Sequence, residues 1–109
     1  MMMPYQIEKM LFDIYKAFLD TQHENSNTLR SGIYFHSPCV LKHYTKHMDI
    51  HIKKKAFFIK FLTKLGLVDC LGLKIYSYNA YSCSLQLYVK KEYTGREDEI
   101  YTIWRMMRS

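Results

Sequence analysis

The chain has 109 residues, of which 49% are hydrophobic, with 16 lysines and arginines against 10 acidic residues. This length predicts a single domain spanning residues 1–109, and the hydrophobic content excludes a disordered chain. The net charge of +6 favours a polyanionic partner such as nucleic acid or an anionic membrane surface.

The first predicted element is an amphipathic helix over residues 4–20. Pro4 suits a first helical turn, and charged side chains lie away from one apolar stripe. This stripe consists of Ile7, Leu11, Ile14 and Phe18. The polar stretch 21–32 then predicts a loop, and residues 33–35 (IYF) predict a short strand.

Two further helices are predicted in the middle of the chain. Ser37 and Pro38 signal a helix start, and the apolar positions after them predict a short helix that ends at Met48. These positions are Val40, Leu41, Tyr44 and Met48. Asp49 is the expected N-cap of a third helix that ends at Leu65, before Gly66. Its buried side is expected to contain Phe57, Phe58, Phe61, Leu62 and Leu65.

A β-hairpin and a last helix complete the predicted order. In residues 67–93, apolar residues alternate with others on both sides of the turn formers NAYS at 79–82. The alternating residues are Leu73, Ile75, Leu85, Leu87 and Val89. Thr94 and Glu97 have capping-box spacing for a helix over 94–108. Its apolar stripe consists of Ile100, Ile103, Trp104 and Met107. This stripe either caps the domain's own core or pairs with a second copy in a homodimer, and we expect the homodimer.

A helix pair joined by a tight turn and followed directly by a two-stranded ribbon resembles the winged helix-turn-helix family of DNA-binding domains. The most specific segment is FLTKLGLVDCLG at residues 61–72, where leucines end a helix and Leu-Gly-Leu-Val leads into a strand, as between a recognition helix and its wing. Small basic winged-helix proteins of archaeal viruses and plasmids are similar in style. The resemblance implies an α+β fold with a three-helix core and a wing (4–91) and a C-terminal helix (94–108). It also implies sequence-specific binding to double-stranded DNA, as in a transcriptional regulator.

The third helix, residues 49–65, is the expected recognition helix. On a helical wheel its outer side carries Ala56, Ile59 and Thr63, with Lys53, Lys60 and Lys64 at the edge. In a major groove the lysines would contact phosphates, and Ala56 and Thr63 would lie near base edges. The competing interpretation is that these lysines form only the solvated side of a core helix.

Residues outside this helix extend the candidate DNA-binding surface. Lys46 and His43 are expected on the outer side of the preceding helix, and a protonated histidine would strengthen binding to phosphates. Four hairpin tyrosines could stack on bases, although packing is the expected role of most of them. They are Tyr76, Tyr78, Tyr81 and Tyr88.

Cys39, His43, His47 and His51 follow one another at a constant spacing of four. On one continuous helix each step climbs about 6 Å, so these four side chains cannot meet a single ion whose bonds are about 2.0–2.3 Å long. An adjacent pair such as His43 and His47 could chelate a metal only with ligands from elsewhere. We therefore expect a polar surface and no metal or other cofactor.

The sequence also limits catalysis and location. It contains no phosphate-binding loop, no HExxH and no cluster of carboxylates, so we expect a protein that is not an enzyme. Three cysteines without a CxxC spacing and an N-terminus without a signal sequence predict a cytoplasmic protein. The most apolar run, residues 56–68, contains two lysines and is shorter than the roughly 20 residues that cross a bilayer, so no membrane partner is expected.

A second function remains open from the residues. The same fold could serve as a non-enzymatic protein–protein interaction module, such as a viral or plasmid adaptor that inhibits a host factor. Binding to unrelated DNA duplexes at low salt distinguishes the two functions, because a basic DNA-binding protein has non-specific affinity and a protein adaptor need not.

Overall fold

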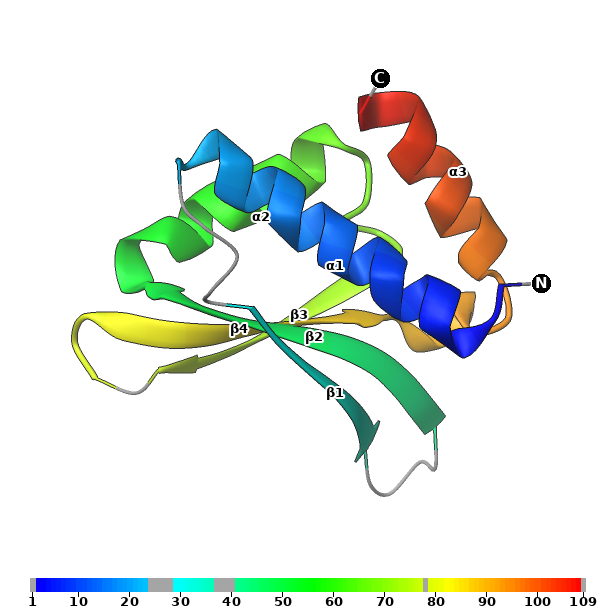
Figure 1. Ribbon diagram of the computed structural model, residues 1–109, viewed down its shortest axis with the longest axis horizontal. Helices are drawn as coiled ribbons and strands as arrows, with labels where there is room; N and C mark the ends of the chain where they lie inside the picture. The colour runs from blue at the N-terminus through cyan, green and yellow to red at the C-terminus, as the bar shows by residue number, and fades with distance from the viewer. Residues whose placement is uncertain (1, 24–28, 37–40, 78, 109) are drawn as a thin grey trace.

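The computed structural model describes residues 2–23, 29–36, 41–77 and 79–108, with the backbone alone over 29–36 and 41–49. Its elements are α1 (Pro4–Thr21), β1 (Leu29–His36), β2 (Leu41–His51), the 3-10 turn η2 (Ile52–Lys54), α2 (Lys55–Lys64), β3 (Leu71–Ser77), β4 (Ser82–Val89), η3 (Lys91–Tyr93) and α3 (Glu97–Arg108). The four strands form one antiparallel sheet in the order β1-β2-β4-β3. All three helices lie on one side of this sheet (Figure 1). The expected α+β class is therefore confirmed.

The core lies between the sheet and the helices. The four apolar residues expected on the buried side of α1 are all buried: Ile7, Leu11, Ile14 and Phe18. The ring of Tyr15 stacks on Phe58 of α2 with centroids 5.3 Å apart, and Phe18 meets the same ring edge-on at 4.8 Å. In β4 the alternating residues Leu85, Leu87 and Val89 are buried as expected. These aromatic and aliphatic contacts fix the orientation of α2 against α1 and the sheet.

The prediction of a helix over residues 37–48 is wrong. Residues 41–51 form strand β2, which pairs with β1 on one side and with β4 on the other. A spacing of four, as between Tyr44 and Met48, keeps two residues on one side of a helix and also on one side of a strand. The apolar stripe therefore does not discriminate between a helix and a strand. β-formers such as Thr45 and Ile50, together with pairing along both edges, favour the strand. Val40 and the start signal Ser37–Pro38 lie outside the described residues.

The loss of this helix changes the arrangement within the α+β class. No helix directly precedes α2 in the part of the chain that the structure describes; β2 leads into it through η2. The structure therefore does not confirm the winged-helix arrangement or a three-helix core with a separate wing. The expected order of α2 followed directly by a two-stranded hairpin, β3 and β4, is present. The expected short strand at 33–35 is longer, since β1 covers Leu29–His36.

The third predicted helix is shorter than expected. Asp49 lies in β2 and is not an N-cap; instead, Nδ1 of His51 accepts a hydrogen bond of 3.2 Å from the backbone N–H of Lys53 at the start of η2. The helix ends at Lys64, and Gly66 adopts a φ of +72° after it, which is the left-handed conformation that glycine accommodates at a helix end. Phe57, expected to be buried, is 49% exposed, whereas Phe58 and Leu62 are buried.

Helix α3 mostly completes the chain's own core. Ile100 and Trp104 are buried, Ile103 packs against them, and Met107 is exposed. The helix begins at Glu97 and not at residue 94. Oε1 of Glu97 accepts a hydrogen bond from the backbone N–H of Gly95, whereas the expected capping box requires one from the backbone N–H of Thr94. Within the described ranges, no helix has the length and apolar character needed to cross a membrane.

Candidate nucleic-acid interface

The exposed side of η2 and α2 carries the predicted DNA-contacting residues of this segment. Phe58 and Leu62 point into the core, so the opposite side of α2 faces solvent. The exposed residues there include all five that the sequence placed on this helix: Lys53, Ala56, Lys60, Thr63 and Lys64. We call Lys53, Lys60 and Lys64 the lysine row. The structure therefore leaves these three charged side chains accessible to a partner.

The spacing of the lysine row suits a linear polyanion. At about 1.5 Å per helical residue, Lys60 and Lys64 are separated by roughly 6 Å along the axis, and Lys53 lies roughly 17 Å from Lys64. Double-stranded DNA carries one charge per about 1.7 Å of axis, so a stretch of that length presents roughly ten phosphates. Each lysine of the row can therefore meet a different phosphate.

The start of α2 adds to the positive potential. Its first turn contains no acidic residue, and Lys54 and Lys55 stand at its N-terminus with partial exposure. The N-terminal end of a helix carries a partial positive charge, which stabilises anions. This charge does not offset the positive charge of lysines at the same end. Residues 50–68 include five lysines and no aspartate or glutamate. An anionic partner would therefore relieve the mutual repulsion of these groups.

Two shorter side chains on the same side have different capacities for base contacts. The hydroxyl of Thr63 donates a 2.8 Å hydrogen bond to the carbonyl oxygen of Ile59, so in this rotamer it can only accept from a base. Ala56 offers a methyl group, which suits the methyl group of thymine. The surface is therefore better suited to phosphate contacts than to reading a sequence.

The tip of the β3–β4 hairpin lies beside this surface, which the sequence did not reveal. The backbone N–H of Ile52 donates a 2.8 Å hydrogen bond to the carbonyl oxygen of Tyr81. Asn79 orders the tip, because its Oδ1 accepts hydrogen bonds from the backbone N–H groups of Tyr81 and Ser82 at 2.7 and 3.0 Å. Tyr81 is 73% exposed next to η2. Its ring and hydroxyl extend the candidate interface beyond the lysines.

The other hairpin tyrosines differ in their environment. Tyr76 and Tyr81 are both exposed, so packing does not explain these two of the four tyrosines. Tyr88 is half-buried, as packing predicts, and Tyr78 lies outside the described residues.

Lys46 and His43 are not on a helix next to α2. Both belong to β2, where the register places Lys46 opposite Leu87 and His43 opposite Tyr34. Their expected place on an outer helical side is therefore wrong. The structure does not bring them together with the lysine row.

The constant spacing of Cys39, His43, His47 and His51 takes a different form in the structure. His43, His47 and His51 lie along β2, where a spacing of four residues corresponds to about 13 Å at roughly 3.3 Å per residue. Cys39 lies outside the described residues. In the described part of the chain, no three histidine, cysteine, aspartate or glutamate residues are placed to hold a metal ion.

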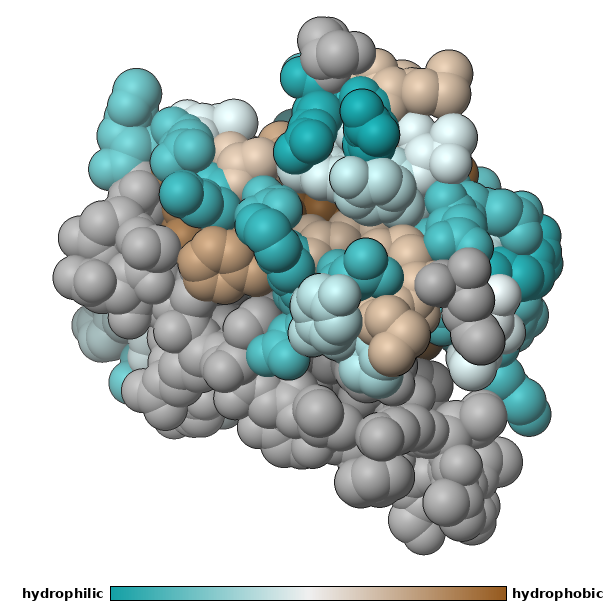
Figure 2. Space-filling view, turned by 45° about the vertical axis from the view of Figure 1, so that its right-hand side comes forward, coloured by the Kyte–Doolittle hydropathy of each residue, from teal (hydrophilic) through white to brown (hydrophobic). Residues whose placement is uncertain are grey.

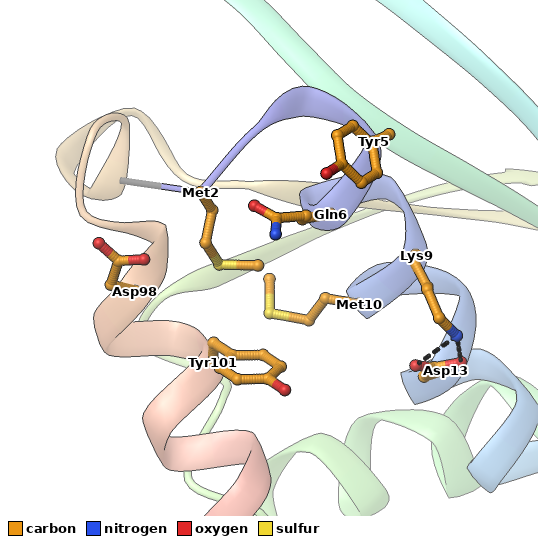
Figure 3. Close-up of a pocket in the computed structure, with 8 residues that line it drawn as sticks. All are labelled: Met2, Tyr5, Gln6, Lys9, Met10, Asp13, Asp98 and Tyr101. Atoms are coloured by element: carbon orange, nitrogen blue, oxygen red, sulfur yellow. Dashed lines mark hydrogen bonds and ion pairs between the residues drawn. The ribbon is translucent and has the colours of Figure 1, made fainter.

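A hollow lies between the start of α1 and the start of α3 (Figure 3). It has a volume of about 530 Å³ and is lined by Met2, Tyr5, Gln6, Lys9, Met10, Asp13, Asp98 and Tyr101. Lys9 and Asp13 form an ion pair of 3.4 Å at its rim. None of the eight lining residues is a serine, cysteine or histidine. On the face that contains this hollow, apolar side chains lie between hydrophilic ones (Figure 2).

Both cysteines that the structure describes, Cys70 and Cys83, are buried. Burial raises the pKa of the Cys70 thiol. This thiol donates a hydrogen bond of 3.4 Å to the carbonyl oxygen of Leu67.

No protein-family model, curated protein or solved structure matches this chain.

Proposed function

We propose that the chain binds double-stranded DNA through the lysine row and acts as a transcriptional regulator. The observation that carries the proposal is that Lys53, Lys60 and Lys64 are exposed on the side of η2 and α2 opposite the buried Phe58 and Leu62. The order of α2 followed by the β3–β4 hairpin, which the winged-helix resemblance also contains, supports it further. The lysines supply affinity for phosphates, and Ala56 and Thr63 are the groups nearest to a base edge.

The proposal predicts a definite dependence on salt. If all five lysines between residues 53 and 64 neutralise a phosphate, log affinity falls against log salt with a slope of about −4.5, at roughly −0.9 for each contact. Fluorescence anisotropy with a labelled 20-base-pair duplex of random sequence measures this slope between low and physiological salt. A slope near zero, or no binding at low salt, contradicts the proposal.

A second candidate is a protein–protein interaction module that uses the same side of α2. Phe57 and Ile59 are 49% and 42% exposed beside the lysine row, and exposed apolar side chains are frequent at protein interfaces. This function does not require affinity for unrelated duplexes at low salt, so an absence of binding in the titration above favours it over DNA binding. The expected homodimer stays a prediction, which light scattering tests.

A further inference from the structure

A second group of lysines and tyrosines lies at the base of the β3–β4 hairpin, away from the lysine row. It surrounds a cavity of about 580 Å³, a volume typical of small-molecule sites. The lining residues are Asp69, Lys74, Tyr88, Lys90, Lys91, Glu92 and Tyr93. We call this cavity the hairpin-base pocket.

None of the helices α1, α2 and α3 covers the other side of the sheet (Figure 1). Leu71 in β3 and Leu87 and Val89 in β4 are buried in the core under the helices. Residues at the intervening positions, Lys74 and Tyr88, therefore point to the opposite side. Helix α2 and the lysine row lie on the helix-covered side, so the two basic surfaces are separate.

The aromatic wall of the pocket is fixed by the backbone beneath it. The ring of Tyr88 lies across Gly72, its cross-strand partner, so closely that a methyl group at Gly72 would collide with it. Nζ of Lys74 stands 5.8 Å from the centroid of the same ring. A phenol ring held flat by a glycine, with the ammonium group of a long lysine side chain over it, is a suitable surface for another planar aromatic group once that ammonium moves to an anion.

The cationic side of the pocket is also held in place. The backbone N–H of Lys90 donates a 3.0 Å hydrogen bond to the carbonyl oxygen of Cys70, and its Nζ donates one of 3.1 Å to that of Val68. Lys91 follows it with an exposed side chain. The three lysines of the pocket outnumber the two carboxylates, Asp69 and Glu92. A phosphate group therefore meets a net positive charge there.

From this geometry we infer that the hairpin-base pocket binds a nucleotide unit, with the base against Tyr88 and the phosphate near Lys74, Lys90 and Lys91. The combination of a planar ring and a nearby ammonium cluster matches the two parts of a nucleotide, a flat base and an anion. Only an unpaired base can lie on a ring, so the ligand is a free nucleotide or a single strand and not a duplex. The inference does not depend on duplex binding at the lysine row.

The test uses the full chain with Lys53, Lys60 and Lys64 replaced by Gln, so that the lysine row does not contribute. The probe is a labelled 12-nucleotide oligothymidylate, displaced by thymidine 5′-monophosphate, thymidine or inorganic phosphate. We expect the monophosphate to displace the probe at a lower concentration than either of its parts. Equal displacement by inorganic phosphate would show a simple anion site and overturn the inference.

Three variants locate the binding. Tyr88→Leu removes the ring and should weaken probe binding about tenfold, as expected for one stacked base, whereas Tyr88→Phe keeps the ring and should retain binding. Lys91→Gln changes an exposed side chain, so it should fold even if Tyr88→Leu does not, and it should weaken binding several-fold. Lys16→Gln on α1 is the control, with no expected effect. Unchanged affinity in Lys91→Gln and Tyr88→Leu contradicts the inference.

The source of the nucleotide follows from the same titration. If oligothymidylate binds at least tenfold more tightly than the monophosphate, the ligand is a single strand that makes further contacts. If the two bind equally, the ligand is a free nucleotide. Either result supports the pocket, whereas binding of neither overturns it.

Discussion

Replacing the lysine row by glutamine isolates its contribution to DNA binding. The triple variant Lys53→Gln, Lys60→Gln and Lys64→Gln removes three charges and keeps polar side chains of similar length. All three side chains are exposed, and Phe58 and Leu62 hold α2 from its other side. The fold should therefore be unchanged, with a melting temperature close to that of the natural chain.

The size of the expected effect follows from the number of contacts. With five lysines on phosphates, raising salt from about 50 to 200 mM weakens binding about 500-fold, since each contact contributes a slope of roughly −0.9. With two contacts left, the same change in salt weakens binding only about twelvefold. The slope itself should change from about −4.5 to about −1.8.

Fluorescence anisotropy with a 20-base-pair duplex at several salt concentrations measures both slopes. The matched control removes the same charge from the α1–α3 side by Lys16→Gln, Arg105→Gln and Arg108→Gln, all at exposed positions. If net charge alone drove binding, the two triple variants would behave alike. An unchanged slope in the lysine-row variant, or an equal change in the control, would refute the assignment of the interface.

Substitutions at three positions test the fold that supports these surfaces. Tyr15→Phe removes the 3.0 Å hydrogen bond from the buried hydroxyl to the carbonyl oxygen of Leu85, which should lower the free energy of unfolding by about 1 kcal/mol in urea titrations. Burial raises the pKa of Tyr15 well above its usual 10.0, so the stability that Tyr15 contributes is complete below pH 10 and declines above it, where the unfolded chain ionises first. Tyr15→Phe should flatten this decline above pH 10. Gly72→Ala should cost about 1–3 kcal/mol because of the collision with Tyr88, and much of that loss should disappear in the double variant with Tyr88→Ala; two purely additive losses would contradict the packing. Trp104→Ala should cost about 3–5 kcal/mol, as for a buried indole, whereas a loss below about 1 kcal/mol would place this residue outside the core.

The elements that could be predicted are those with a single consistent period. The apolar spacing of α1 fits a helix and not a strand, and the alternation of Leu85, Leu87 and Val89 fits a strand and not a helix. The exposure of the lysine row could also be predicted, because Phe58 and Leu62 determine the buried side of α2. For these parts, local sequence and tertiary packing favour the same structure.

The parts that could not be predicted depend on contacts between distant residues. The spacing of four from Tyr44 to Met48 fits both periods, and only pairing with β1 and β4 determines that this segment is a strand. The proximity of Tyr81 to η2 follows from the pairing of His51 with Ser82, which local sequence does not specify. Whether Trp104 would pack in its own core or in a homodimer likewise depended on the position of α3 over the sheet.

Binding of duplex DNA at η2, α2 and the hairpin tip, as we propose, can be mapped residue by residue. In a titration of the ¹⁵N-labelled protein with a random duplex, NMR follows the shifts of the backbone amide signals. We expect the largest shifts at residues 52–64 and at Tyr81, with little change along α3. Shifts concentrated on α1 and α3, or none at low salt, would contradict it.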